Sequence, residues 1–243
     1  MNLQLLFGIL LPFFGTSLGA AAVFLVRKGR FSDENAILSG FASGVMMAAS
    51  VWSLIIPAVE MCSQFGFFSF VPMVSGLWLG LCIMIFLERF SNHIFKQKES
   101  GRFLFILAVV LHNIPEGMAV GASFACAANG NLTPALILSA GIALQNIPEG
   151  AIISAPLKAD GKPGTLAFAY GSLSGIVEPI AAFFTLLFSA LATAVLPYLL
   201  GFAAGAMIYV TVKELLPSAS KNTGVLWFFI GFTTMMVLDI ALG

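Results

Sequence analysis

The sequence predicts an all-α, polytopic membrane protein with eight transmembrane helices. Of its 243 residues, 59% are hydrophobic and only 9% are charged, whereas soluble domains carry about 25% charged residues. This length suits about eight spans of roughly 20 residues with short connections. The formal net charge of +0 does not favour a nucleic-acid partner. The three cysteines, Cys62, Cys82 and Cys126, are widely separated, so we interpret them as packing residues rather than a redox or metal motif.

Apolar stretches define the spans in chain order. They lie at residues 5–26, 36–58, 67–87, 103–126, 133–154, 165–189, 194–216 and 223–242. The first stretch, Met1 to Ala22, has the apolar run of a signal peptide. It lacks a basic start, however, and stays apolar to Val26. We therefore interpret it as the first span and not as a cleaved leader.

The basic residues support this division because they fall into alternate connections. All 11 Lys and Arg residues lie after an odd-numbered span or, for Lys213, near its end: Arg27, Lys28 and Arg30; Arg89, Lys96, Lys98 and Arg102; Lys158 and Lys162; Lys213 and Lys221. The connections near residues 59–66, 127–132 and 190–193 hold none. The positive-inside rule then places the odd-numbered connections in the cytoplasm and both termini outside.

A polar heptapeptide occurs twice in the fourth and fifth spans, as LHNIPEG at residues 111–117 and as LQNIPEG at residues 144–150. The copies are 33 residues apart, from His112 to Gln145, about one span plus a tight connection. In each copy the first polar residue and the glutamate are four positions apart and share a helix face. The proline between them leaves the carbonyl of the residue four earlier without its helical partner. Such groups are costly in lipid, so they indicate a cation site. A simple proline kink is the alternative, which the repetition disfavours.

A second internal repeat relates the second and seventh spans. Residues 40–46 (GFASGVM) match residues 201–207 (GFAAGAM) at an offset of 161. The two spans cross the membrane in opposite directions, and inverted repeats are typical of secondary transporters. Close packing alone would select the shared small residues, but not the matched Phe and Met. The predicted organisation is a three-helix repeat (1–88), a central helix pair with the motifs (103–154) and a second three-helix repeat (165–243).

The paired motifs resemble those of the ZIP (Zrt/Irt-like protein) family of divalent metal transporters, in its prokaryotic GufA-like branch. Residues 40–47 and Gly175-Ile176-Val177-Glu178-Pro179 match as well, so the resemblance covers essentially the whole chain. It implies eight helices in a 3+2+3 arrangement, external termini and a multi-pass protein of the inner or plasma membrane. It further implies uptake of zinc, and of iron, manganese, cobalt or cadmium, into the cytoplasm, and it makes a homodimer an expectation. The metal is the transported substrate, and no prosthetic group is expected.

The resemblance also implies a binuclear site, residue by residue. One metal position would use His112, Glu116, Gln145 and Glu149, with Met46 nearby. The second would use Asn113, Glu116, Asn146, Glu149 and Glu178, with Glu116 and Glu149 bridging. Many family members have histidine where this chain has Gln145, and some have an acidic residue in place of Asn146. Both departures lower the charge and donor strength of the site. Imidazole and carboxylate ligands suit zinc, iron, cobalt and manganese.

Three further residues are candidates for the transport pathway. Ser53 and Glu60 lie at the outer end of the second span, where a metal could enter, although a solvated helix end explains them equally well. Glu214, next to Lys213 near the inner end of the seventh span, could belong to an exit-side pair or simply accompany a snorkelling lysine.

Two other function classes compete with transport. An intramembrane hydrolase could use Ser174 as nucleophile with His112 as base, or a glutamate-bound metal. A serine in a Gly-rich span is usually a packing residue, however, and a hydrolase has no use for a second motif copy without histidine. A structural or receptor-like protein would not need glutamates inside the membrane. The chain contains no Gly-rich nucleotide loop followed by Lys-Ser/Thr, so coupling to ATP is not expected. A carrier and a channel both remain compatible with the sequence.

Overall fold

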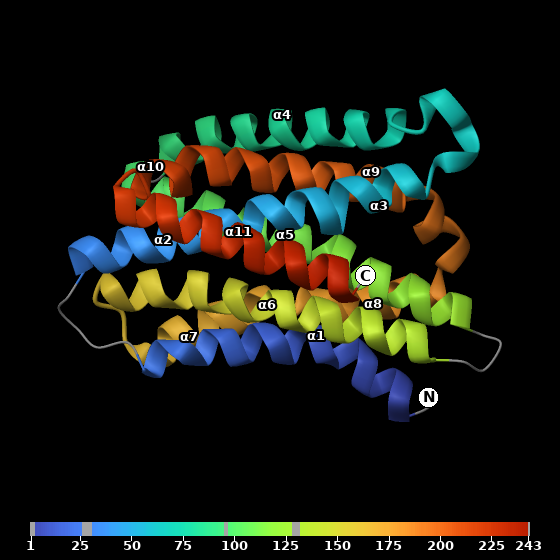
Figure 1. Cartoon of the computed structure of the whole chain (residues 1–243), viewed down its shortest axis with the longest axis horizontal. Helices are drawn as coiled ribbons and strands as arrows, with labels where there is room; N and C mark the ends of the chain where they lie inside the picture. Colours follow the sequence, from blue (N-terminus) through green and yellow to red (C-terminus); the bar gives the residue numbers. More distant parts are fainter. Residues whose placement is uncertain (1–2, 26–30, 95–96, 128–131, 243) are drawn as a thin grey trace.

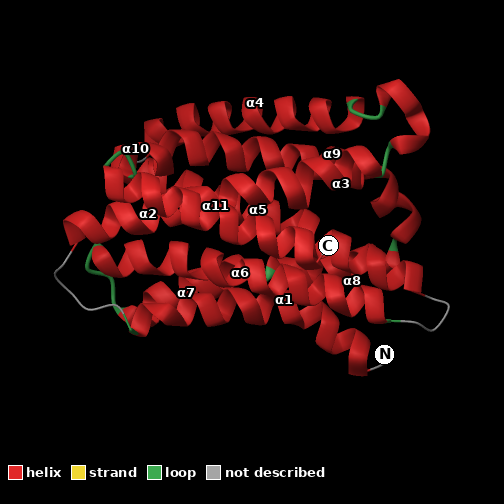
Figure 2. Ribbon diagram, viewed as in Figure 1, coloured by secondary structure: helices red, strands yellow, loops and turns green. Residues whose placement is uncertain are grey.

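The structure, a computed structural model, describes residues 3–25, 31–94, 97–127 and 132–242. In these residues the chain forms helices joined by short turns and contains no strand (Figures 1 and 2). The long helices run roughly side by side in one bundle. This is the expected outcome for a chain in lipid, because a helix satisfies all of its backbone hydrogen bonds within its own segment.

The first half of the chain forms three long rods. The first is α1 (Leu3–Ala21), extended by the 3₁₀ turn η1 (Ala22–Phe24). The second is α2 (Phe31–Ala49), the π-helical turn η2 (Ser50–Ile55) and α3 (Ile56–Glu60). The 3₁₀ segment η3 (Ser63–Phe68) then leads to α4 (Val71–Ile94). The third span therefore begins at Val71 rather than at residue 67 as predicted, because the chain first turns at Gly66, whose φ is 55°.

The second half contains the motif helices and three further rods. The motifs lie in α5 (Gln97–Cys126) and α6 (Thr133–Ala159). The remaining helices are α7 (Gly164–Ser174), α8 (Val177–Leu187), α9 (Ser189–Val210) with the π-helical turn η5 (Thr211–Leu215) and α10 (Leu216–Ser218), and α11 (Asn222–Leu242).

The predicted sixth span, 165–189, is broken at Gly175-Ile176 into α7 and α8. Pro179 has no N–H to donate to the carbonyl of Gly175, four residues earlier. That carbonyl instead accepts the N–H of Glu178 at 3.1 Å, as in a 3₁₀ turn. The break thus has a local cause, and it places Glu178 in the first turn of α8.

Seven stretches in the described part of the chain are long and apolar enough to cross a membrane. They are Leu3–Phe24, Ala36–Glu60, Val71–Phe90, Thr133–Ala159, Gly164–Leu187, Ala194–Ser218 and Asn222–Ala241. Each overlaps a predicted span, which confirms an all-α multi-pass membrane protein. The predicted fourth span lies within α5, which is not among the seven. The start of α1 and the end of α11 lie at the same end of the bundle (Figure 1), as an even number of crossings requires. This supports a count of eight, which stays a prediction.

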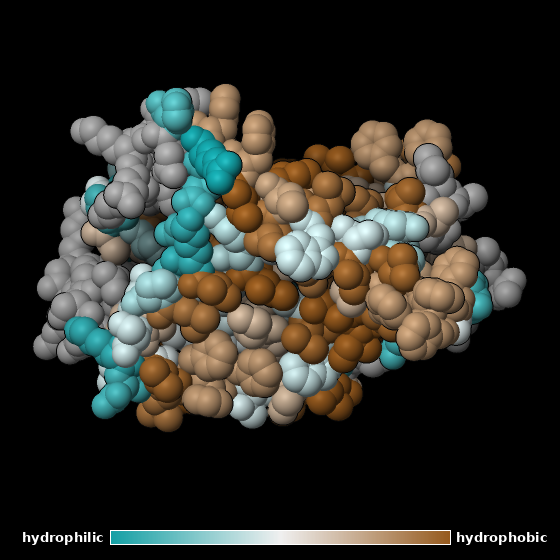
Figure 3. All heavy atoms as spheres, turned by 90° about the horizontal axis from the view of Figure 1, so that it is seen from above, coloured by the Kyte–Doolittle hydropathy of each residue, from teal (hydrophilic) through white to brown (hydrophobic). Residues whose placement is uncertain are grey.

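The surface has the polarity that lipid requires. Large apolar side chains of α4 and α11 point outward: Trp78 is 60% exposed, Phe86 66% and Leu226 60%. Figure 3 shows hydrophobic residues over most of the middle of one face, with hydrophilic residues gathered mainly at its left-hand end. An apolar surface this extensive indicates contact with acyl chains rather than water.

The long helices pack in four pairs, and each pair joins a helix that ends at or before Cys126 to one that begins at or after Thr133. They are α1 with α6, α8 with α5, α2 with α11, and α9 with α4. The repeat makes α1 equivalent to α7 and α8, α2 to α9, α4 to α11, and α5 to α6. Under this equivalence the pair α1–α6 corresponds to α8–α5, and the pair α2–α11 corresponds to α9–α4. The π-helical turns obey the same exchange, because η2 starts at Ser50 and η5 at Thr211, 161 residues later.

The repeated glycines make equivalent contacts. A Cβ at Gly44 would lie 2.1 Å from the carbonyl oxygen of Phe228 in α11. One at Gly205 would lie 2.2 Å from the carbonyl oxygen of Leu77 in α4. Only glycine permits backbones to approach this closely. These matched contacts support the proposed inverted repeat.

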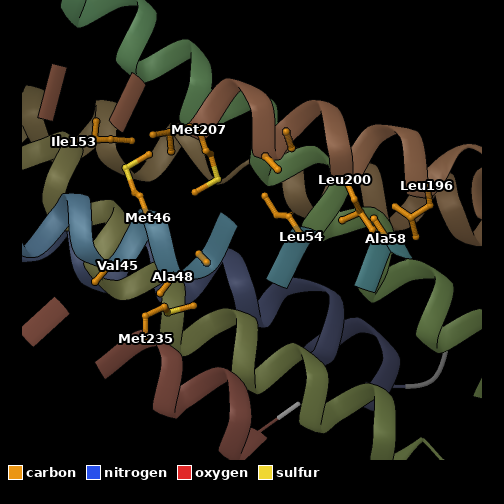
Figure 4. Packing of buried hydrophobic residues seen from close by; sticks show 14 of the residues in the cluster. Val45, Met46, Ala48, Leu54, Ala58, Ile153, Leu196, Leu200, Met207 and Met235 are labelled. Atoms are coloured by element: carbon orange, nitrogen blue, oxygen red, sulfur yellow. The ribbon is translucent and has the colours of Figure 1, made fainter. Parts of the chain in front are cut away.

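The apolar core lies where α2, α6 and α9 meet. Met46, Leu54, Ile153 and Met207 are almost fully buried there. In Figure 4 the side chains of Met46 and Met207 lie beside each other, from helices that the repeat relates.

Candidate metal site

The two motif copies place their polar side chains inside the bundle. Five of them are nearly inaccessible to solvent: Asn113 (0%), Glu116 (3%), Gln145 (3%), Asn146 (0%) and Glu149 (2%). Glu178, at the start of α8, is also buried (1%). The backbone of His112 lies in α5, but its side chain lies outside the described part of the structure. Polar groups buried to this degree inside a membrane bundle indicate function.

A direct hydrogen bond joins the two motif copies. The Nε2 of Gln145 donates to Oε1 of Glu116 at 2.5 Å. On its other side, Oε1 of Gln145 lies 3.2 Å from the hydroxyl oxygen of Ser53. The Ser53 hydroxyl also lies 2.8 Å from Oδ1 of Asp239 in α11. A polar chain therefore runs from Asp239 through Ser53 and Gln145 to Glu116.

This polar chain lies in the wall of a cavity of about 600 Å³. Glu60 and Met61 line it at the end of α3, and Glu116 and Gln145 line it within the bundle. Of the predicted pathway residues, Ser53 and Glu60 both line this cavity, which reaches the motifs at Glu116 and Gln145. The remaining lining is largely apolar, for example Leu138.

Asp239 also lines this cavity, a place that sequence reasoning did not assign to it. A carboxylate in the last apolar span was visible, but its partner Ser53 lies 186 residues away in sequence. No local pattern connects the two. The only available signal was the rarity of an ionisable residue within a span.

A second polar cluster lies between α1, α6 and α8. The Nδ2 of Asn146 donates to Oε2 of Glu178 at 2.9 Å and lies 3.4 Å from the carbonyl oxygen of Pro12. Across the site, Nδ2 of Asn113 donates to the carbonyl oxygen of Ser174 at 3.2 Å. Thr16 of α1 donates to Oε1 of Glu178 at 3.3 Å.

These bonds fix how the two asparagine amides are oriented, because only their NH₂ groups can donate to the surrounding oxygens. The Oδ1 atoms of Asn113 and Asn146 are then buried and have no hydrogen-bond partner among the side chains and backbone that the structure describes. Leaving such an acceptor unsatisfied in a low-dielectric interior costs about 1–3 kcal/mol. A cation coordinated by these oxygens would recover that cost.

The carboxylates of the site also repel one another. Glu116 and Glu149 both act electrostatically on the buried Glu178, and this repulsion is strong where the dielectric constant is low. In the part of the chain that the structure describes, His, Cys, Asp and Glu side chains alone form no group of three spaced to hold a metal. The donor set brought together here is a mixture of carboxylates and amides.

Two predicted residues lie away from these clusters. Met46 packs in the apolar core and does not line the cavity. Glu214 lies in η5 and is likewise not part of the cavity wall. Its neighbour Lys213 forms an ion pair with Glu88 of α4, and Tyr209 also donates to Glu88. Lys213 and Tyr209 thus link the end of the seventh span to α4, and a pathway role of Glu214 stays a prediction.

The serine of the hydrolase alternative is engaged within its own helix. The Ser174 hydroxyl donates to the carbonyl oxygen of Gly171 at 2.7 Å, and the side chain is buried. This is the usual back-bonding of a serine inside a helix. The hydroxyl proton is therefore engaged by the backbone and not by a general base, the partner that nucleophilic catalysis requires.

Comparison with known proteins gives consistent results. The family model described as ZIP Zinc transporter matches residues 99–239. The zinc transporter ZIPB of Bordetella bronchiseptica is 36% identical over 95% of this chain and 79% of its own length. The zinc transporter GufA of Myxococcus xanthus is 35% identical over 94% of both chains. The human zinc transporter ZIP11 is 32% identical over 99% of this chain and 97% of its own.

Proposed function

The chain belongs to the ZIP family of metal transporters, and on this premise we propose that it carries zinc across the membrane through the site between α5 and α6. It is a multi-pass membrane protein that transports divalent metal cations, and it is not an enzyme. Family membership thus decides against the hydrolase alternative. Iron, manganese, cobalt and cadmium are further proposed substrates, because mixed carboxylate, amide and imidazole ligands accept all of these ions.

One observation carries the proposed route, namely the cavity that joins Glu60 to Glu116 and Gln145. An ion that enters at Glu60 meets Asp239 and Ser53 next, then the Gln145–Glu116 link. To coordinate it, Gln145 must exchange its hydrogen bond to Ser53 for a bond to the metal. At each step along this route the ion exchanges one oxygen ligand for another. No single contact then binds so tightly that the ion cannot be released on the other side of the membrane.

The proposed site holds up to two ions. His112, Glu116, Gln145 and Glu149 would bind the first, and Met46 would join them only after a change in the packing of the core. Asn113, Asn146 and Glu178 would bind the second, with Glu116 and Glu149 shared. The unpartnered asparagine oxygens support this second position. The cations would also neutralise the repulsion among the glutamates.

The proposed direction of transport is inward. The cavity is lined by Glu60 and Met61 at the end of α3 and by Asp239 near the end of α11. The distribution of Lys and Arg predicts that these helix ends are external. We accordingly propose that both termini lie outside the cytoplasm. The protein itself would reside in the inner or plasma membrane. We also propose a homodimer, which the resemblance to the family implies.

The first test is uptake of radiolabelled zinc into proteoliposomes. Wild type should show saturable uptake, whereas Glu116→Gln and Glu149→Gln should each lower it at least tenfold, because each removes a charge that the ion requires. Ser139→Ala is the matched control, since Ser139 is buried in α6 but bonds only to its own helix. Competition with iron, manganese, cobalt and cadmium would rank the substrates. Folded wild-type protein that moves none of these metals would refute the proposal.

A further inference from the structure

Thr16 of α1 contacts the candidate site although no motif includes it. Its side chain is fully buried (0%). The hydroxyl oxygen lies 3.3 Å from Oε1 of Glu178 and also 3.3 Å from the carbonyl oxygen of Pro12. Back-bonding to Pro12 alone would be the ordinary behaviour of a helical threonine. The carboxylate contact sets Thr16 apart, because it reaches a proposed metal ligand in another helix.

Two glycines from the site helices hold Thr16 in this place. A Cβ at Gly150, the last residue of the second motif copy, would lie 1.9 Å from the carbonyl oxygen of Thr16. A Cβ at Gly175, just before α8, would lie 2.7 Å from its hydroxyl oxygen. Both positions therefore need glycine so that α1 can approach. Packing this close leaves the Thr16 side chain little freedom to turn away from Glu178.

The internal repeat gives Thr16 a second connection to the site. Gly150 packs against the carbonyl of Thr16, and its counterpart Gly117 packs in the same way against the carbonyl of Glu178. The carbonyls four residues earlier, those of Pro12 and Ser174, each face the Nδ2 of a motif asparagine. Thr16 and Glu178 are separated by 162 residues in sequence, and so are Pro12 and Ser174. Thr16 thus occupies in α1 the position that Glu178 occupies in α8.

We propose that Thr16 is a positioning residue of the metal site, which holds Glu178 in its ligating orientation. By donating to Oε1, the hydroxyl fixes the carboxylate plane while Asn146 holds Oε2. Glu178 is then set for the second ion before that ion arrives. Groups that orient a metal ligand in this way contribute about 10–100-fold to metal affinity. The inference rests on the proposed function, because it assumes that Glu178 binds the transported metal.

The test measures zinc binding to the purified, detergent-solubilised protein by calorimetry. Thr16→Val keeps the shape of the side chain but removes the hydroxyl. The zinc-binding step assigned to the second position, which Glu178 serves, should therefore lose about 10–100-fold in affinity. Thr16→Ser restores the hydroxyl and should bind within about threefold of wild type. Thr185→Val is the matched control, because Thr185 is also buried, also bonds the carbonyl four residues earlier and also packs against a glycine, Gly121. It should bind zinc as wild type does.

A double-mutant cycle separates positioning from packing. In a Glu178→Gln background, Thr16→Val should have almost no further effect on zinc affinity, because the hydroxyl acts through that carboxylate. Independent, additive losses would overturn the proposal, and so would unchanged binding in Thr16→Val. A Thr16→Ser variant as defective as Thr16→Val would also refute it. If wild type binds no zinc, both this proposal and the proposed function fail. If wild type binds and transports zinc normally, a negative result for Thr16 refutes this proposal alone.

Discussion

At the scale of single residues, the buried amide side chains of the site differ in which of their atoms form hydrogen bonds. The asparagine nitrogens bond to backbone or carboxylate oxygens, and this leaves their oxygens as acceptors. Gln145 instead uses both ends of its amide, toward Glu116 and Ser53. The first arrangement is ready for a cation, whereas the second must open to receive one.

Asp239 provides the residue-scale prediction for entry. Asp239→Asn keeps a partner for Ser53 but removes a negative charge from the cavity wall. We expect the KM for zinc uptake to rise several-fold with little change in Vmax, because the residue attracts the incoming ion without holding it in the central site. Asp160→Asn, at an exposed position after α6, is the control and should leave both constants unchanged. A loss confined to Vmax would assign Asp239 to a later step.

At the scale of helices, contacts between glycine and carbonyl groups define the closest pairs. The backbones of α2 and α11 meet at Gly44, and those of α9 and α4 meet at Gly205. In both rods a π-helical turn follows, where the N–H of Ile56 donates to Val51 and that of Leu216 to Thr211, five residues earlier. Such turns rotate the side chains that follow. Ser53, within the first turn, reaches both Asp239 and Gln145.

This packing predicts equal effects of two distant substitutions. Gly44→Ala and Gly205→Ala each place a methyl group about 2 Å from a carbonyl oxygen, and overpacking of this kind costs about 1–3 kcal/mol. Both variants should lower the thermal unfolding midpoint in detergent by similar amounts. Gly164→Ala should have little effect, because its nearest neighbour would be 3.6 Å away. A large difference between the first two variants would argue against the inverted repeat.

At the scale of the whole molecule, the two sides of the site differ. A cavity reaches Glu116 and Gln145 from the end of α3. The described core around Met46, Ile153 and Met207 is densely packed and apolar (Figure 4). Among the described residues, the cavity thus reaches the site from the bundle end that the sequence predicts to face outward.

Cysteine labelling tests this asymmetry. In a variant without the native cysteines, Ser123→Cys in the cavity wall should react with a membrane-impermeant maleimide added outside intact cells. Ile153→Cys, which replaces a side chain that is 2% exposed, should not react. Saturating zinc should slow labelling at residue 123 by occupying the route. Labelling at that residue only from the cytoplasmic side would reverse the proposed orientation.

How much could be predicted from sequence differs among these scales. The approximate spans and the motif positions were predictable, because hydropathy and the spacing of Pro and Glu are local signals. The break before α8 was in principle visible in Pro179. The two π-helical turns, the Ser53–Asp239 bond and the place of Thr16 were not predictable, because they depend on contacts between segments far apart in the chain. The side-chain contacts of His112 stay a prediction.

The helix pairing also has a consequence for how the protein is made. The close neighbours of α1, α2 and α4 are α6, α11 and α9, all from later parts of the chain. Because helices are synthesised in chain order, the first three spans enter the bilayer before their partner helices exist. Their glycine-containing faces therefore have no helix to pack against at that stage. The face of α2 that carries Gly44 stays unpaired longest, since its partner α11 is synthesised after α6 and α9. These helix pairs can therefore be completed only after α11 has been translated, and until then the nascent protein depends on lipid or a chaperone to cover these surfaces.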